Sequence, residues 1–178
     1  LKNNYRGSYK YCYCTKSSHF RHIVEEALKN DIHLETSSAF DMPMIDVLEK
    51  KGVVSKDITV ICNGFKTFQY KQYIIDMLHD GFQNIVPVLD NKEEFNLYDD
   101  EVELDTPCNL GIRIAAEEQP DSQFYTSRLG VRMEDVIDFY NAKIVHNPNF
   151  KVKLLHFFIN SGISDTPYYW NELEKYVT

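Results

Sequence analysis

The sequence has no long hydrophobic run and is short of positive charge. No apolar stretch reaches the about 18 residues that a membrane-spanning helix needs, and no signal-like segment opens the chain. The 27 Asp and Glu residues outnumber the 19 Lys and Arg residues, which gives a formal net charge of −8. Because negative charge repels phosphate groups, we expect neither nucleic acid nor a membrane as a partner, and we expect a cytoplasmic protein.

Cysteine is also scarce, and its spacing does not suit a metal site. The four cysteines stand at 12, 14, 62 and 108. The first two are too close together for a zinc-ribbon pair, and no second pair or suitably spaced histidine pair follows. Each cysteine lies among apolar residues, so we expect reduced, buried thiols and no metal. His19 and His22 have no acidic partner at matching spacing and are interpreted as solvated helix residues.

The sequence lacks an initiator methionine, and its last segment still has a helical pattern where the chain stops at Thr178. We therefore interpret it as a piece of a longer protein. Its 178 residues, 43% of them hydrophobic, suffice for one substantial core and not for two. We predict a single domain over residues 1–178.

Apolar residues recur with a period of two in some segments and of 3.6 in others, in alternation along nearly the whole chain. Strands are predicted over 9–15, 33–37, 59–63, 85–89, 110–116 and 152–159, and helices over 17–30, 40–51, 66–79, 134–145 and 165–177. Residues 91–109 predict a short helix and a loop. Repeated strand-then-helix units imply a parallel sheet, either open and doubly wound or closed as a barrel. The repeat length of about 30 residues per strand–helix unit is typical of a (β/α)8 barrel of the TIM type. We predict an α/β fold, a partial barrel with about six of the eight units.

Side chains alternate between the two faces of a strand, and this alternation gathers charged residues on one face. Lys16 shares a face of the first strand with its two cysteines. Glu35 faces away from Leu34 in the second strand, and Arg113 faces away from the isoleucines of the fifth. In a barrel, this face points inward and its charges reach the C-terminal mouth, where barrel enzymes hold their active sites. Any one of the three could simply cap a strand end. Three together favour a site, because a buried charge without a partner is costly.

Lys16 is the most informative of the three. A lysine at the inner end of a barrel strand, near Arg113 and partly removed from water, is expected to lose its proton more readily. Its neutral amine could then attack a carbonyl group and form a Schiff base. The residues alone therefore predict carbonyl chemistry at Lys16.

Five stretches in order along nearly the whole chain carry a family resemblance. They are "YRGSYKYCYCTKSSHFRHIVEEAL", "HLETSSAFDM", "VICNGFK", "LGIRIAAE" with the later "SRLGV", and "LLHFFINSGI". Together they resemble the fold type III pyridoxal-phosphate (PLP) decarboxylases. They are most similar to the biosynthetic arginine decarboxylases and more distantly to ornithine and diaminopimelate decarboxylases. The resemblance implies a carboxy-lyase that converts arginine to agmatine and carbon dioxide in polyamine biosynthesis.

The resemblance also implies roles for single residues. Lys16 would be the catalytic lysine that forms a Schiff base with PLP, Glu35 an acidic residue near the cofactor, and Arg113 a charge close to its ring. Arg128 would be the basic residue before a Leu-Gly pair. Ser161 would donate a hydrogen bond to the cofactor phosphate. The pyridoxal ring would act as the electron sink for the carbanion that remains when carbon dioxide departs.

The last stretch departs from the family pattern. Where the family usually stacks a histidine on the cofactor ring, this chain has Phe158, and Asn160 replaces the glycine that normally follows. Phe158 can still stack on the ring. It cannot donate a hydrogen bond or a proton, which affects the protonation step or its specificity. His156 shares the face of Phe158 about one layer deeper and is interpreted as a core histidine, while Leu155 is predicted to pack under helices.

In this family the glycine-rich phosphate loops, the acid that pairs with the pyridine nitrogen and a cysteine from the partner subunit lie further along the chain. We therefore expect the 178 residues alone to be inactive. We expect the full-length protein to form a homo-oligomer that acts on a small amino acid. Three alternatives stay open. They are a scaffold that binds PLP without decarboxylating, a decarboxylase of ornithine or diaminopimelate, and a purely structural unit.

Overall fold

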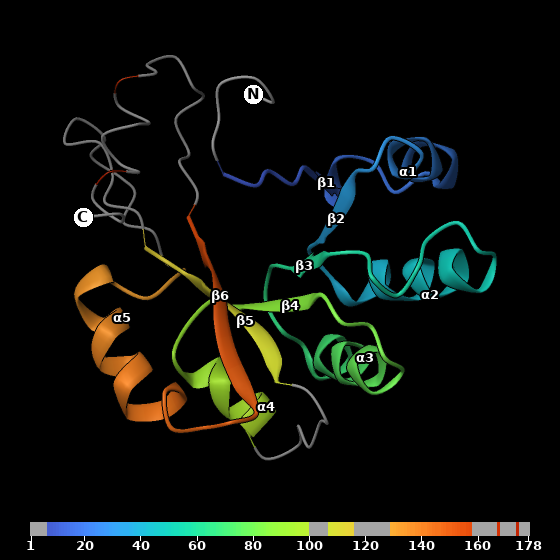
Figure 1. The fold of residues 1–178 in the computed structure, drawn as a ribbon. Helices are drawn as coiled ribbons and strands as arrows, with labels where there is room; N and C mark the ends of the chain where they lie inside the picture. The colour runs from blue at the N-terminus through green and yellow to red at the C-terminus, as the bar shows by residue number, and fades with distance from the viewer. Residues whose placement is uncertain (1–6, 100–106, 116–128, 158–166, 168–173, 175–178) are drawn as a thin grey trace. The chain divides into compact units, whose positions relative to one another are not determined.

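The computed structural model describes residues 7–99, 107–115, 129–157, 167 and 174 (Figure 1). The chain divides into two compact units, Leu1–Pro87 and Val88–Thr178. The first unit holds three strand–helix pairs and the first part of the fourth strand. The second unit holds the end of the fourth strand and the elements that follow it.

All six predicted strands are present, and every pair of neighbours is parallel. The order in the sheet, β1-β2-β3-β4-β5-β6, is the order in the chain. A doubly wound sheet reverses its strand order at a switch point, whereas a barrel keeps chain order throughout. The order therefore confirms the α/β fold of a partial barrel. The bounds are β1 Cys12–Cys14, β2 His33–Thr36, β3 Val60–Cys62, β4 Ile85–Leu89, β5 Cys108–Arg113 and β6 Phe150–His156.

The helices alternate with the strands as predicted. They are α1 Arg21–Leu28, α2 Met42–Lys50, α3 Phe68–His79, α4 Asn96–Asp99 and α5 Met133–Phe139, which continues as a π-helical turn over Tyr140–Ile144. α1 begins later than predicted because Thr15–Ser17 form a 3-10 turn and Ser18 then has extended backbone angles (φ −166°, ψ 123°). The helix predicted over 165–177 lies almost entirely outside the described residues.

In the first unit, the two faces of the sheet differ as the alternation predicts. Leu34 and Thr36 of β2 are buried, and the Thr36 hydroxyl reaches the sulfur of Met42 in α2 (3.8 Å) and the hydroxyl of Tyr70 in α3 (2.7 Å). This face therefore packs against α2 and α3. Each fully buried leucine or isoleucine stabilises the fold by about 1.5–3 kcal/mol. The opposite face, which carries Glu35, is half-buried.

The second unit packs around aromatic rings. The Phe95 ring meets those of Phe139 and Phe150 edge-on, with centroids 6.0 and 5.1 Å apart. The prediction that Leu155 packs under helices is wrong, because 41% of this residue is exposed. Among the described strands, β6 pairs only with β5, and its residues after Phe150 alternate between exposed and half-buried.

Candidate active site

The predicted charged residues stand at or near the carboxyl ends of strands. Lys16 follows β1 in the turn Thr15–Ser17, and Glu35 lies in β2, where its Cα pairs with that of Cys14. Both belong to the first unit. Arg113 is the last residue of β5 and belongs to the second unit. In each unit, the charges thus occupy the ends of parallel strands at which barrel enzymes hold their active sites.

Lys16 lies just beyond its strand, so the alternation along β1 does not extend to it. Thr15 beside it is fully buried, and the Thr15 hydroxyl donates a hydrogen bond to the backbone carbonyl of Glu35 (3.2 Å). This bond fixes the turn against β2. Sequence reasoning expected Lys16 to be partly removed from water, but it is exposed. Within the described residues, no hydrogen bond or ion pair engages its amine.

Glu35 shares a face with the two cysteines of β1. Burial raises the pKa of the Cys12 and Cys14 thiols, and the Glu35 carboxylate raises both further. The Lys16 ammonium acts in the opposite direction on the pKa of Cys14, so Lys16 and Glu35 act on the same thiol. The register pairs Glu35 directly with Cys14, so these two side chains lie on the same face of the sheet. A thiol with a raised pKa is protonated at neutral pH and is a poor nucleophile.

A tight turn after β3 holds the Glu35 carboxylate. Nδ2 of Asn63 donates a hydrogen bond to Glu35 Oε1 (3.1 Å), and Asn63 Oδ1 accepts one from the Gly64 backbone N–H (2.9 Å). Gly64 has a φ of +84°, and a Cβ at this position would lie 2.5 Å from the Ser37 carbonyl oxygen. The buried Lys66 closes the turn by donating to the Gly64 carbonyl (2.6 Å). The turn therefore requires glycine.

In the second unit, a buried carboxylate holds Arg113. Nη1 of Arg113 lies 3.3 Å from Oδ1 of Asp90, and the exposed fractions of the two side chains are 15% and 1%. The Asp90 backbone N–H donates to the carboxylate of the buried Glu94 (2.9 Å). Oδ2 of Asp90 is buried without a hydrogen-bond partner among the described residues. Arg113 thus has a fixed place at the end of β5.

The last two residues of the "SRLGV" stretch, Gly130 and Val131, lie against the end of β5. The Val131 N–H donates to the Arg113 carbonyl (2.7 Å), and the Gly130 N–H donates to the Asp90 carbonyl (2.7 Å). Gly130 has a φ of +106°, and a Cβ there would lie 2.6 Å from the backbone nitrogen of Ala115. The predicted site residues Arg128, Phe158 and Ser161 lie outside the described residues.

Sequence reasoning missed Asn63 and Asp90 as site residues. Asp90 directly follows β4, a run of five apolar residues, and a polar residue at a strand end is the signal that singled out Lys16. The alternation places Asn63 only at the end of the strand predicted over 59–63. Its contact with Glu35 follows from the geometry of the turn after β3, which the sequence does not reveal.

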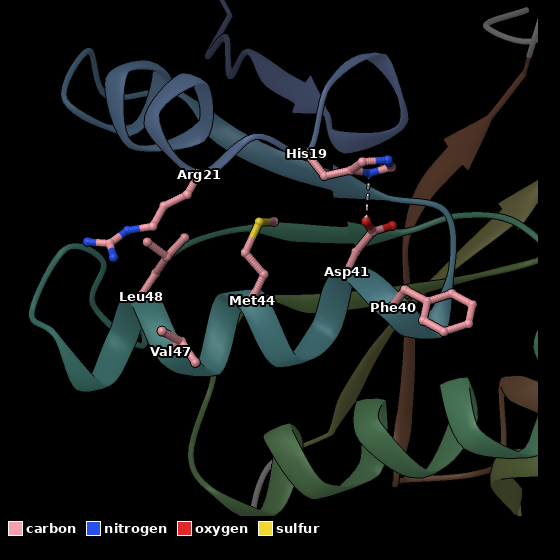
Figure 2. Close-up of a pocket in the computed structure, with 7 residues that line it drawn as sticks. All are labelled: His19, Arg21, Phe40, Asp41, Met44, Val47 and Leu48. Carbon is pink, nitrogen blue, oxygen red and sulfur yellow. Dashed lines mark ion pairs between the residues drawn. The ribbon is translucent and has the colours of Figure 1, made fainter.

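A cavity of about 260 Å³ lies elsewhere in the first unit, between the start of α1 and α2 (Figure 2). His19 Nδ1 and Asp41 Oδ1 are 3.5 Å apart at its edge. No predicted site residue lines the cavity, so we do not assign the site to it. Its lining consists of His19, Arg21, Phe40, Asp41, Met44, Val47 and Leu48.

The described part of the chain offers neither a metal site nor a membrane span. There, no group of three His, Cys, Asp or Glu side chains could hold a metal ion. No helix described in the structure is long and apolar enough to cross a membrane.

The sequential strand order and the charged strand ends define the class as a partial α/β barrel with a candidate site at its strand ends. Among solved structures, the chain is similar to diaminopimelate decarboxylase from M. jannaschii in co-complex with L-lysine. The TM-score is 0.70 at 18% identity, over 94% of this chain and 38% of that one. It is also similar to a mutant of SrLDC in complex with PLP, with a TM-score of 0.72 at 17% identity, over 93% of this chain and 39% of that one. These likenesses show the fold.

In sequence, the chain is similar to the biosynthetic arginine decarboxylase of Prochlorococcus marinus (strain MIT 9303). The two are 24% identical over 173 residues, which are 92% of this chain and 26% of that protein. The chain therefore spans about a quarter of the length of the curated relative it matches. No protein-family model matches the chain. The resemblance to fold type III decarboxylases that the five stretches indicate is confirmed by this relative and by the shared barrel fold.

Proposed function

We propose that the chain is part of a PLP-dependent amino-acid decarboxylase and that Lys16 is its Schiff-base lysine. The observation that carries the proposal is the placement of Lys16. Its amine is exposed directly after β1, in a turn that Thr15 ties to β2 beside Glu35. We infer arginine as the substrate because the sequence relative is an arginine decarboxylase and "VICNGFK" is typical of such enzymes.

The residues present fit PLP. Its aldehyde needs an accessible primary amine, and Lys16 offers one. Two other lysines near the strands of the first unit have their amines engaged, Lys10 by the Thr59 hydroxyl (2.9 Å) and Lys66 by the Gly64 carbonyl (2.6 Å). When bound, the cofactor supplies an electron sink for the carbanion formed on loss of carbon dioxide.

The chain's own side chains supply binding and charge. Lys16 binds the cofactor aldehyde, and Glu35 presents a carboxylate on the neighbouring strand, held by a hydrogen bond. Arg113 presents a guanidinium, which stays charged at any physiological pH and is fixed by Asp90. We carry Arg128, Phe158 and Ser161 forward as proposed cofactor-binding residues on the resemblance alone.

An absorbance titration of the full-length protein with PLP tests the assignment of Lys16. Wild type should develop the visible band of lysine-bound PLP, and Lys16→Ala should lose it. The matched control is Lys10→Ala, which removes another amine of the first unit and should keep the band. A Lys16→Ala protein that retains the band would show that another amine carries the cofactor.

Release of carbon dioxide by the full-length protein tests the reaction and the substrate. Arginine, ornithine, lysine and diaminopimelate are offered in parallel, and we expect release from arginine. Release from another of the four would reassign the substrate. A PLP band without release from any of them would favour a binding module, which the phenylalanine at position 158 makes the second candidate.

A further inference from the structure

We propose that Asn63 is a positioning residue that holds the Glu35 carboxylate toward β3 and away from the Cys14 thiol. The inference deepens the proposed function, because it names the residue that orients the acidic group of the site. Its geometric part stands on contacts within the first unit and can be tested without any cofactor.

Asn63 is fixed through both its backbone and its side chain. Its N–H donates to the Thr36 carbonyl (2.9 Å), and its carbonyl accepts from the Tyr70 hydroxyl (3.2 Å). Its Oδ1 accepts from the Gly64 N–H (2.9 Å). With the backbone and Oδ1 held, the direction of Nδ2 is determined. Nδ2 points at Glu35 Oε1, 3.1 Å away.

The elements around Asn63 resist movement. Tyr70 and Thr36 are fully buried, and their hydroxyls lie 2.7 Å apart. Gly64 approaches the strand end after β2 so closely that no other residue fits without a shift. Lys66, 4% exposed, donates to the Gly64 carbonyl. A donor held by these contacts can impose an orientation on a half-buried glutamate, because hydrogen bonds to charged groups are stronger than those between neutral groups.

The reactivity of the Cys14 thiol depends on where the Glu35 carboxylate lies, because the carboxylate raises the thiol pKa. Glu35 pairs with Cys14 on one side and with Ile61 of β3 on the other. The charged groups that act on the Cys14 thiol are Glu35, Lys16 and Asp41. Without Asn63, the carboxylate is free to turn toward Cys14, and its closer negative charge disfavours the thiolate.

The test is the pH dependence of Cys14 alkylation in the full-length protein without PLP, measured by peptide mapping with iodoacetamide. In Asn63→Ala, we expect Cys14 to react about threefold more slowly at pH 8, the effect of a unit charge that moves a few ångströms closer at intermediate dielectric. Asn63→Asp retains the side-chain volume and the acceptor for Gly64 but replaces the donor by a repelling oxygen. It should slow Cys14 by at least as much.

Two control variants show whether a change in the Cys14 reaction rate comes from the Glu35 charge. Glu35→Gln removes the charge and should make Cys14 react faster than in wild type. Asn84→Ala deletes a side-chain hydrogen bond elsewhere in the first unit, from Asn84 Nδ2 to the Asp57 carbonyl (2.9 Å), and should leave Cys14 unchanged. Cys62, which is fully buried, must stay unmodified in every variant, because its alkylation marks loss of the fold.

An unchanged or faster Cys14 reaction in both folded Asn63 variants would overturn the inference. This outcome is separable from failure of the proposed function. A wild-type protein that forms no PLP band but shows the expected thiol shifts would refute the decarboxylase proposal and leave the positioning role intact. If wild type forms the PLP band but Cys14 reacts at the wild-type rate in both Asn63 variants, the positioning role is refuted and the decarboxylase proposal stands.

Discussion

The buried thiol of Cys62 should make the protein lose stability in alkaline solution. Cys62 lies in β3 and is fully buried, and burial raises its thiol pKa from 9.0 to about 11 against smaller opposing effects, among them the hydroxyl of Thr36. In the unfolded chain, the thiol ionises near its ordinary pKa. The folded chain keeps it neutral for about two further pH units. The corresponding stability is therefore fully present below pH 9 and is lost as the pH rises toward 11.

The size of the loss follows from the interval between the two pKa values. About 11 minus 9.0 is about two units, and each unit corresponds to 1.36 kcal/mol. Cys62 alone should therefore remove about 2 kcal/mol from the free energy of unfolding between pH 9 and pH 11, with the remainder of the loss above pH 11. Such a loss is a large share of the stability of an ordinary domain.

Urea unfolding of the full-length protein at pH 7.5, 9, 10 and 11 measures the effect, with Cys62→Ala as the partner variant. The tyrosines and lysines titrate in both proteins, so their contributions cancel in the difference. Cys62→Ala should be the less stable protein at pH 7.5, because it leaves a cavity in a packed core. Its deficit should shrink by about 2 kcal/mol as the pH rises to 11. A deficit that is constant with pH would refute the reasoning.

Two further predictions compare matched variants by unfolding measurements. Gly64→Ala should cost about 3 kcal/mol, because its Cβ would collide with a backbone carbonyl oxygen, whereas Gly52→Ala, with a φ of +70° and open space around it, should cost about 1 kcal/mol. Equal costs would mean that the turn after β3 can relax. Asp90→Ala should cost about 3 kcal/mol, because the Arg113 side chain is only 15% exposed and its guanidinium would lose its carboxylate partner. Asp135→Ala, which breaks an ion pair with exposed side chains, should cost under about 1 kcal/mol. An Asp90 variant as stable as the Asp135 variant would contradict the fixed place of Arg113.

The hydrophobic pattern of the sequence predicted the bounds of a strand well where both of its faces are buried. The apolar run of β4 was predicted with its observed bounds, Ile85–Leu89, because turn residues flank it on both sides. β1, Cys12–Cys14, is shorter than the strand predicted over 9–15. Tyr9 and Tyr11 continue the alternation, but they are 60% and 53% exposed and precede the first paired residue. A period of two shows which residues could form a strand, and pairing with the neighbour decides which of them do.

The candidate site could be predicted only in part, because the alternation fixes side-chain direction within a strand and not in the turns that follow. Glu35 was placed on the correct face because it lies within a strand, where side-chain direction follows from position. Lys16 was expected to continue β1, yet a 3-10 turn begins at Thr15 and leaves Lys16 exposed. The pairs Asn63–Glu35 and Asp90–Arg113 join residues 28 and 23 positions apart. Such contacts depend on how turns fold back, and no local pattern in the sequence encodes them.

The assignment of Lys16 is tested most directly by trapping the cofactor on the chain. The full-length protein is incubated with PLP, reduced with borohydride, digested and mapped by mass spectrometry. Reduction should leave a phosphopyridoxyl group on the peptide that contains Lys16, and Lys16→Arg should carry none at that peptide. A phosphopyridoxyl group on a different lysine of the wild-type protein, with Lys16 unmodified, would contradict the account.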